Sequence, residues 1–316
     1  MRRGLALIRH YQPAAIWSTY PIATAHVIGA HLQARSGLPW IADFRDPMAQ
    51  DDYPTDPKTW ASFKHIEEAT VQAARLSVFT TPGAADMYRQ RYPDVAERMR
   101  VIENGYDEET FAAVTSSTAP RTPLNAGALT LLHSGVVYPS ERDPTQFFDA
   151  LAALKQSGAS LPAFRVRFRA SGNDALLKRM VEQRGLNDWV ELAPSLPYAA
   201  ALDEMLRADA LLVLQAANCN QQIPAKLYEY LRAGRPVIGL TDPAGDTAAT
   251  LRAAGLTWIA PLDNATQIAE LLRRALGQIA QGQGPLARAD AVQAASRSAR
   301  SAQLAQLLEG VTDPGR

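Results

Sequence analysis

Hydrophobic and polar positions along the chain follow two alternating patterns. Short apolar runs alternate with longer segments in which apolar residues recur at the three- and four-residue spacing of an amphipathic helix. In the first third of the chain, the short runs lie at 15–20, 40–44, 76–81 and 99–105. Strands separated by helices are typical of a parallel sheet with helices on its faces. The first third therefore predicts a Rossmann-like α/β domain.

A second and more regular set of runs follows a stretch that is rich in Ser, Thr, Pro and Ala. These runs predict six strands, at 129–133, 164–170, 189–193, 210–215, 236–240 and 256–260. Six strands alternating with helices make a complete doubly wound domain, and the stretch without periodicity is the best candidate for a linker. We therefore divide the chain into a first domain (1–113), a linker (114–128), a second Rossmann-like domain (129–285) and a C-terminal Ala-rich helix (286–316).

The composition argues against several kinds of partner and structural feature. Of the 316 residues, 47% are hydrophobic, and 32 Lys and Arg balance 32 Asp and Glu, so net charge gives no reason to expect a nucleic acid or an anionic membrane surface as a partner. No apolar run approaches the roughly 20 residues that a membrane-spanning helix needs. Cys219 is the only cysteine, which excludes an internal disulfide and fits a reducing cytoplasm.

Ligands of a doubly wound sheet bind at the carboxyl ends of its strands, so the residues that follow each strand are candidates. Gly135 follows the strand at 129–133 and permits close approach of a ligand to the backbone, and Arg142 is placed to return over the same loop towards phosphate oxygens. The alternative is a plain surface turn with a solvated arginine, which this segment taken alone favours.

The segment "IPAKLYEYLRAGRPVIGL" (223–240) predicts a short helix with Pro224 at its first position and Gly234 just past its end. A helix N-terminus favours anions, and Lys226 in its first turn makes more sense with an anion present than without one. Glu229 can accept hydrogen bonds from two hydroxyl groups, such as those of a ribose. The alternative, a solvated Lys–Glu pair three residues apart, is equally favoured by the residues alone.

Asp43 and Arg45 lie at the end of the strand at 40–44 in the first domain. Charges so close to a buried strand need partners, and the two side chains either shape the loop as a structural pair or hold a hydroxylated acceptor. We favour the structural role for Arg45 and leave Asp43 open. His133 and His26 are interpreted as packing residues. The chain has no dinucleotide fingerprint after a strand, no Walker loop, no H-E-x-x-H and no G-x-S-x-G motif.

Four stretches resemble the GT-B glycosyltransferases, in particular the family-four-like enzymes that use nucleotide sugars. These are "LPWIADFRDPM" (38–48), "VIENGYDEETF" (101–111), "LLHSGVVYPSERDPTQFFDAL" (131–151) and "PAKLYEYLRAGRPVI" (224–238). The resemblance implies a fold of two Rossmann-like doubly wound domains. It also implies that the N-terminal domain is incomplete, because its first strand–helix units and glycine-rich loop have no counterpart here. A four-stranded remnant would leave an exposed sheet edge.

The resemblance also assigns donor-binding roles. Glu229 matches the carboxylate that binds the donor ribose, Gly135 the glycine of the diphosphate loop and Arg142 the basic residue after it, while Lys226 lies within reach of a donor phosphate or sugar. Leu196 lies where the backbone meets the base. Two positions depart from the pattern. Gln221 stands where many members have a second Glu that contacts the transferred sugar, and its neutral amide can still bind sugar hydroxyls as a donor-binding residue. Val136 replaces an Arg. No catalytic nucleophile is identified.

The implied function is transfer of a sugar from a nucleotide-sugar donor to a glycan, lipid-linked or small-molecule acceptor in the synthesis of cell-surface polysaccharide. The resemblance implies retention of configuration, no metal and no cofactor, and a cytoplasmic location with at most peripheral membrane contact. The alternatives are a nucleotide-sugar epimerase of the same fold and a non-catalytic nucleotide-binding module. With an incomplete acceptor domain, the chain is expected to bind a nucleoside diphosphate and to transfer sugar poorly.

Overall fold

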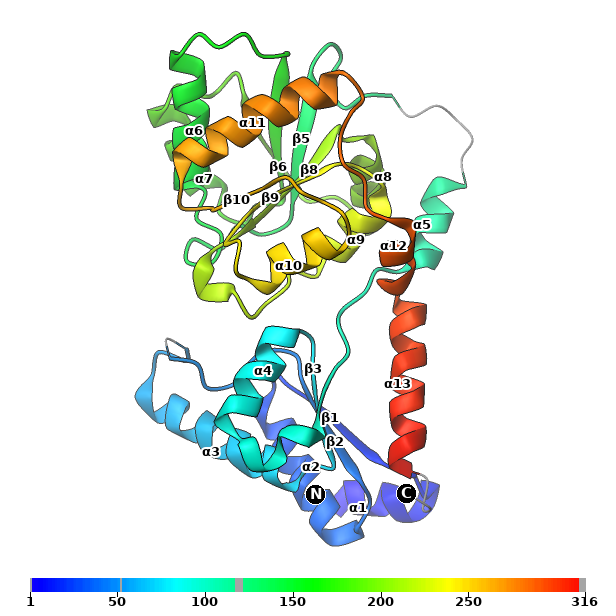
Figure 1. Ribbon diagram of the computed structural model, residues 1–316. Coiled ribbons are helices and arrows are strands. Elements are labelled where there is room, and N and C mark those ends of the chain that lie inside the picture. The colour runs from blue at the N-terminus through cyan, green and yellow to red at the C-terminus, as the bar shows by residue number, and fades with distance from the viewer. Residues whose placement is uncertain (1, 52, 117–121, 313–316) are drawn as a thin grey trace. The chain divides into compact units, whose positions relative to one another are not determined.

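The structure is a computed structural model that describes residues 2–51, 53–116 and 122–312. The chain forms two compact units, one made of Met1–Glu103 with Arg300–Arg316 and the other of Asn104–Ala299. Each unit is built on its own parallel sheet (Figure 1). Within the described residues, no helix is long and apolar enough to cross a membrane.

The first unit has a four-stranded parallel sheet in the order β1-β2-β3-β4. Its strands are β1 (Ile16–Thr19), β2 (Trp40–Phe44), β3 (Leu76–Phe79) and β4 (Met99–Val101). Its helices are α1 (Arg2–Tyr11), α2 (Ala23–Ser36), α3 (Pro57–Ala73), α4 (Pro82–Arg91) and the 3-10 helix η1 (Pro93–Arg98), together with α13 (Arg297–Thr312) from Arg300 onward. Both α3 and α4 begin at a proline, and the residues before them, Asp56 and Thr81, cap them by accepting backbone hydrogen bonds.

The second unit has a six-stranded parallel sheet in the order β10-β9-β8-β5-β6-β7. Its strands are β5 (Leu129–Ser134), β6 (Phe164–Arg169), β7 (Val190–Ala193), β8 (Ala210–Gln215), β9 (Val237–Thr241) and β10 (Ile259–Ala260). Its helices are α5 (Glu108–Thr115), α6 (Thr145–Gln156), α7 (Asp174–Gln183), α8 (Tyr198–Arg207), α9 (Lys226–Ala233), α10 (Asp246–Ala253), α11 (Ala265–Ala280) and α12 (Ala289–Ala294), with a 3-10 turn, η2, at Ala217–Cys219.

Two apolar layers enclose this second sheet. One is formed by α6, α7 and α11, whose buried residues include Phe147, Leu177 and Leu272. The other is formed by α8, α9 and α10 with α5 and α12, and includes Leu202 and Leu227. The strand order reverses between β5 and β8, so a ligand crevice is expected outside the carboxyl ends of these two strands.

The predicted fold class of two Rossmann-like doubly wound units is confirmed, including four strands in the first unit and six in the second within the described residues. Three details differ from prediction. The single helix expected after 285 is two helices, α12 and α13, because a parallel bridge between Tyr106 and Ser296 interrupts it. Pro224 lies before α9 rather than in it. Of the predicted linker, residues 117–121 lie outside the described part, and α5 continues to Thr115.

Candidate functional site

The turn that follows β5 is built around Gly135. Its φ is +110°, a conformation that favours glycine, and a Cβ added there would lie 3.1 Å from the Lys226 Nζ atom. The turn is held in place because Gly135 donates a backbone hydrogen bond to Arg169, and the Ser134 backbone N–H donates to the Tyr230 hydroxyl at 2.9 Å. Gly135 therefore allows the lysine to pack directly against the backbone.

Lys226 opens α9 in the connection that follows β8. Its side chain is largely buried, and its Nζ atom lies 3.1 Å from the Nε2 atom of His133 at the end of β5. Burial, reinforced by the nearby positive charge of Arg142, lowers the pKa of the Lys226 amine to about 7. No carboxylate of the described residues lies within ion-pair distance of this amine. A second nitrogen base thus takes the place of the usual acidic partner.

Arg142 lies over the same loop. Its Nη1 atom donates to the Val136 carbonyl at 2.9 Å, and its guanidinium lies 5.1 Å from the centre of the Tyr138 ring. The Nε atom is buried and has no hydrogen-bond partner among the described residues. A cation that is withdrawn from water needs a counter-charge, and within the described residues neither Arg142 nor Lys226 has a carboxylate at ion-pair distance. The two side chains and the Gly135 turn therefore form a site suited to an anion.

Glu229 lies one turn beyond Lys226 on α9 but does not pair with it. Its carboxylate accepts a hydrogen bond of 2.7 Å from the Tyr198 hydroxyl at the start of α8. Burial raises the pKa of the Glu229 carboxyl, and the Tyr198 hydroxyl opposes that shift. Because Lys226 and Glu229 engage different partners, the solvated ion pair that the sequence left open does not form.

The structure brings Gly135, Arg142 and Lys226 into one cluster, and the two other predicted donor residues lie in nearby loops of the same unit. Leu196 is 38% exposed in the loop before α8, beside Pro194, whose carbonyl accepts a hydrogen bond from Arg169. Gln221 is exposed in the loop between η2 and α9. Their roles in donor binding stay predictions.

His133 and Tyr198 contact this site but were not selected from the sequence. His133 is fully buried, and its ring lies 5.5 Å from that of Phe168, so its interpretation as a packing residue is correct but incomplete. The sequence did give one indication of this role, because His133 lies only two residues before Gly135. Tyr198 gave no signal, because nothing in the sequence brings α8 close to α9.

Asp43 is the penultimate residue of β2 in the first unit. Burial raises the pKa of its carboxyl to about 6, against the opposing effect of the Arg45 charge and a hydrogen bond from Thr19. Arg45 is itself exposed, and its backbone carbonyl accepts a hydrogen bond of 2.6 Å from Thr80. Asp43 therefore stands out as a carboxyl group with a raised pKa at the carboxyl end of a strand.

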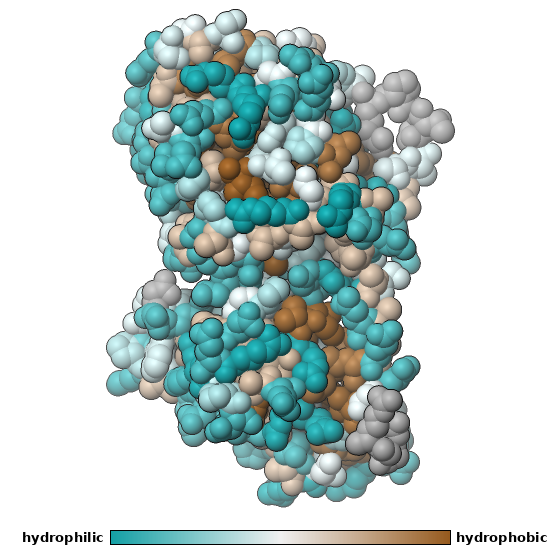
Figure 2. Space-filling model, viewed as in Figure 1, coloured by the Kyte–Doolittle hydropathy of each residue, from teal (hydrophilic) through white to brown (hydrophobic). Residues whose placement is uncertain are grey.

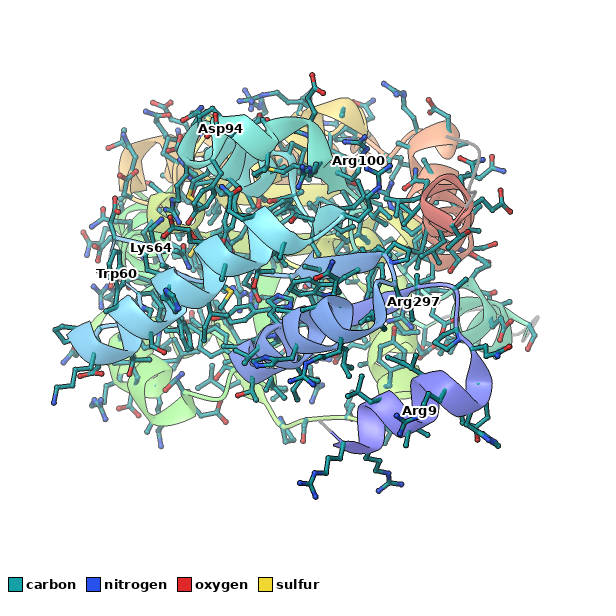
Figure 3. All side chains as sticks on the ribbon, turned by 90° about the horizontal axis from the view of Figure 1, so that it is seen from below. Arg9, Trp60, Lys64, Asp94, Arg100 and Arg297 are labelled. Carbon is teal, nitrogen blue, oxygen red and sulfur yellow. The ribbon has the colours of Figure 1, made fainter. Side chains whose placement is uncertain are left out.

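The loop after β2 is anchored by a buried carboxylate that the sequence did not reveal. Glu67 of α3 accepts hydrogen bonds from the Ala49 backbone, Tyr88, Tyr92 and Arg91. On the same helix, Lys64 also reaches Glu67, and Trp60 donates to a carbonyl of this loop (Figure 3). These contacts fix the backbone that follows Asp43.

A groove of about 1080 Å³ in the first unit lies along the edge strand β4 and α13. Its apolar lining includes Leu76, Val101 and Leu307, and hydrophobic residues gather beside α13 on the face shown in Figure 2. It runs along the side of the sheet rather than at the carboxyl ends of the strands. We therefore do not include it in the candidate site. Among the described residues, no group of three or more His, Cys, Asp or Glu side chains is arranged to hold a metal ion.

No protein-family model matches the chain, and no curated protein matches it. Several solved structures do match the chain. An Anabaena protein, Alr3699/HepE, in complex with UDP is 15% identical, with a TM-score of 0.76 over 98% of this chain and 81% of that one. A glycosyltransferase from Rickettsia africae is 11% identical, with a TM-score of 0.74 over 99% and 81%. Sucrose-phosphate synthase from Thermosynechococcus elongatus is 16% identical, with a TM-score of 0.67 over 97% and 75%.

These similarities establish the fold. The chain has the two Rossmann-like units of the GT-B class, as the similar glycosyltransferase structures do. At identities of 11–16%, they do not by themselves assign an activity or a substrate.

Proposed function

We propose that this protein is a glycosyltransferase that binds a nucleotide-sugar donor through its second unit and moves the sugar to a hydroxylated acceptor. The observation that carries the proposal is the cluster of Gly135, Arg142 and Lys226, in which two cations with no carboxylate at ion-pair distance among the described residues lie beside an open turn of backbone. It follows the carboxyl ends of β5 and β8, where a doubly wound sheet binds its ligand. A diphosphate supplies the counter-charge that the cluster lacks.

Each donor group has a proposed position. The diphosphate would lie against the Gly135 turn and accept hydrogen bonds from Arg142 and Lys226, and the ribose hydroxyls would donate to Glu229. The base would contact the backbone near Leu196, and Gln221 would contact the transferred sugar. Three of the similar structures are described as complexes of the Anabaena protein with UDP, with UDP-glucose, and with UDP and glucose, which supports this class of donor.

In this mechanism the protein stabilises the departing nucleoside diphosphate. Charge develops on the diphosphate as the bond to the sugar breaks, and positioned cations stabilise that charge more strongly in a buried site than in water. Arg142 and Lys226 supply the positive charge, and no metal is part of the proposal. We propose retention of configuration, and we assign no nucleophile.

We place the acceptor side in the first unit, at the carboxyl end of β2. Asp43 is the candidate to bind an acceptor hydroxyl, because its carboxyl group can accept a hydrogen bond from that hydroxyl. Arg45 is the weaker candidate, since its side chain is exposed. A glycan or lipid-linked acceptor of cell-surface polysaccharide synthesis is the acceptor class that we propose.

A thermal-shift panel of UDP, GDP, ADP and dTDP, each with a matching nucleotide sugar, tests the donor proposal. Stabilisation by one diphosphate and its sugar, but not by the free nucleoside, is expected, since ligand binding to the native state raises its stability. The absence of any shift across the panel would refute the proposal. Release of free sugar without an acceptor would instead favour the epimerase.

A further inference from the structure

His133, which is fully buried, and Lys226, which is partly buried, form an unusual pair. Both carry nitrogen bases, and their Nε2 and Nζ atoms lie 3.1 Å apart. A hydrogen bond between two bases needs one nitrogen to present a lone pair, so the pair cannot be fully protonated. His133 is fully buried at the end of β5, and burial, with the charges of Lys226 and Arg142, keeps the pKa of its imidazole well below the ordinary value. The imidazole is therefore neutral, and Nε2 is the acceptor when Lys226 is charged.

The charged groups around the Lys226 amine come from three elements. Arg142, in the loop after β5, disfavours the ammonium form, whereas Glu229 on α9 favours it. The Tyr198 hydroxyl of α8 donates a hydrogen bond to the Glu229 carboxylate, and the charge of Arg297 opposes the rise in the pKa of that carboxyl. Burial dominates this balance and holds the pKa of the Lys226 amine at about 7, so the free protein is close to half protonated there at neutral pH.

We propose that His133 is a positioning residue that holds the Lys226 amine against the Gly135 turn, and that binding of a nucleotide sugar is coupled to proton uptake by that amine. The inference rests on the proposed function, because it takes the diphosphate as the anion at this site. The proton comes from solvent and converts the amine to an ammonium ion, which has three N–H donors. One of them donates to a phosphate oxygen, and another donates to His133 Nε2.

The structure favours this linkage over a permanently charged lysine. A permanent ammonium at this position would face Arg142 with no carboxylate of the described part of the chain at bonding distance, and like charges withdrawn from water are costly. An arriving diphosphate removes that cost and restores the ammonium form. The free site is thus kept partly neutral, and its full charge appears only together with the ligand.

Calorimetry measures this uptake directly. The heat of binding UDP-glucose, or of the nucleotide sugar selected by the thermal-shift panel, is recorded in buffers of different ionisation enthalpy, and the slope gives the protons bound. Nucleotide sugars suit the test because their two phosphates do not titrate near neutral pH. We expect the number of protons bound to rise with pH from pH 6 to pH 8 and to approach one at the upper end, as follows from an amine with a pKa of about 7.

Three variants separate positioning from folding. Lys226→Met removes the amine, so uptake at pH 8 should fall to nearly zero and affinity should fall as well. His133→Leu removes the acceptor and should shift the midpoint of uptake to lower pH by about one unit, as expected for the loss of one hydrogen bond to a charged group. His133→Gln places an amide near the Nε2 position and should return the midpoint towards that of the unmodified protein.

The outcomes distinguish the two proposals. Binding with a heat that does not depend on the buffer at pH 7 and 8 overturns the proton linkage and leaves the donor proposal standing. A midpoint unchanged in His133→Leu overturns the positioning role of His133. If no nucleotide sugar binds the unmodified protein, the proposed function falls, and the linkage falls with it.

Discussion

Gly135 offers the sharpest test of the candidate site, because two separate features of this position require a glycine. Its φ of +110° disfavours any side chain, and a Cβ would lie 3.1 Å from the Lys226 Nζ atom, closer than ordinary contact. The conformation alone should cost Gly135→Ala about 1–3 kcal/mol of folding stability. The displaced amine should in addition weaken its contact with a phosphate. A hydrogen bond to a charged group contributes about 1.5–3 kcal/mol, so the affinity for the nucleotide should fall roughly 10- to 150-fold.

Gly158 provides a matched control. It follows α6 with a φ of +61°, and a Cβ there would have no neighbour within 4 Å. Gly158→Ala should therefore lose stability, about 1–2 kcal/mol, without losing affinity. Urea denaturation measures the first quantity and calorimetry with the nucleotide measures the second. If Gly135→Ala binds as tightly as the control once both proteins are fully folded, the Gly135 turn is not part of an anion site and the reasoning fails.

Three further predictions concern single side chains. Glu229→Ala should weaken binding of the nucleotide by about 1.5–3 kcal/mol in calorimetry, through loss of its hydrogen bonds to the ribose, and unchanged affinity would argue against this role. Arg142→Ala should weaken binding of the nucleoside diphosphate far more than that of the nucleoside, whereas equal losses would indicate an effect on folding. Burial raises the pKa of the Asp43 carboxyl to about 6, so its stabilising contribution is present below the ordinary value and is lost as the pH rises through 6. Asp43→Asn should therefore increase stability at pH 7.5, by at most about 3 kcal/mol in urea denaturation, and have little effect at pH 3.5, and a gain at both pH values would contradict the assignment.

The fold was predictable because its signals are local. Each strand of the second unit is a short apolar run between segments of helical period, and Gly234 ends α9 in the predicted left-handed conformation. The start of α9 was not predictable to the residue. The carbonyl of Pro224 accepts a hydrogen bond from Leu227, which forms a turn before the regular helix begins. Proline is compatible with both arrangements, so its presence alone could not distinguish them.

The candidate site was predictable only as far as strand ends can be read from a pattern. Gly135, Arg142 and Lys226 were found because each follows a strand, and parallel strands end at the same edge of a sheet. Contacts between elements that are distant in the chain were not predictable. His133 meets Lys226 across 93 residues, and Tyr198 meets Glu229 across 31.

Those two contacts change the chemical interpretation of the helix. From the sequence, a lysine and a glutamate three residues apart are equally well explained by a surface ion pair. In the structure, each is engaged by a side chain from another element, and the lysine is left beside a neutral base and a second cation. A surface pair would neutralise itself and have no need of a ligand. In the observed arrangement, positive charge lies at the start of α9 and a hydrogen-bond acceptor lies one turn away. A nucleotide carries the complementary groups, because its diphosphate is negatively charged and its ribose hydroxyls donate hydrogen bonds.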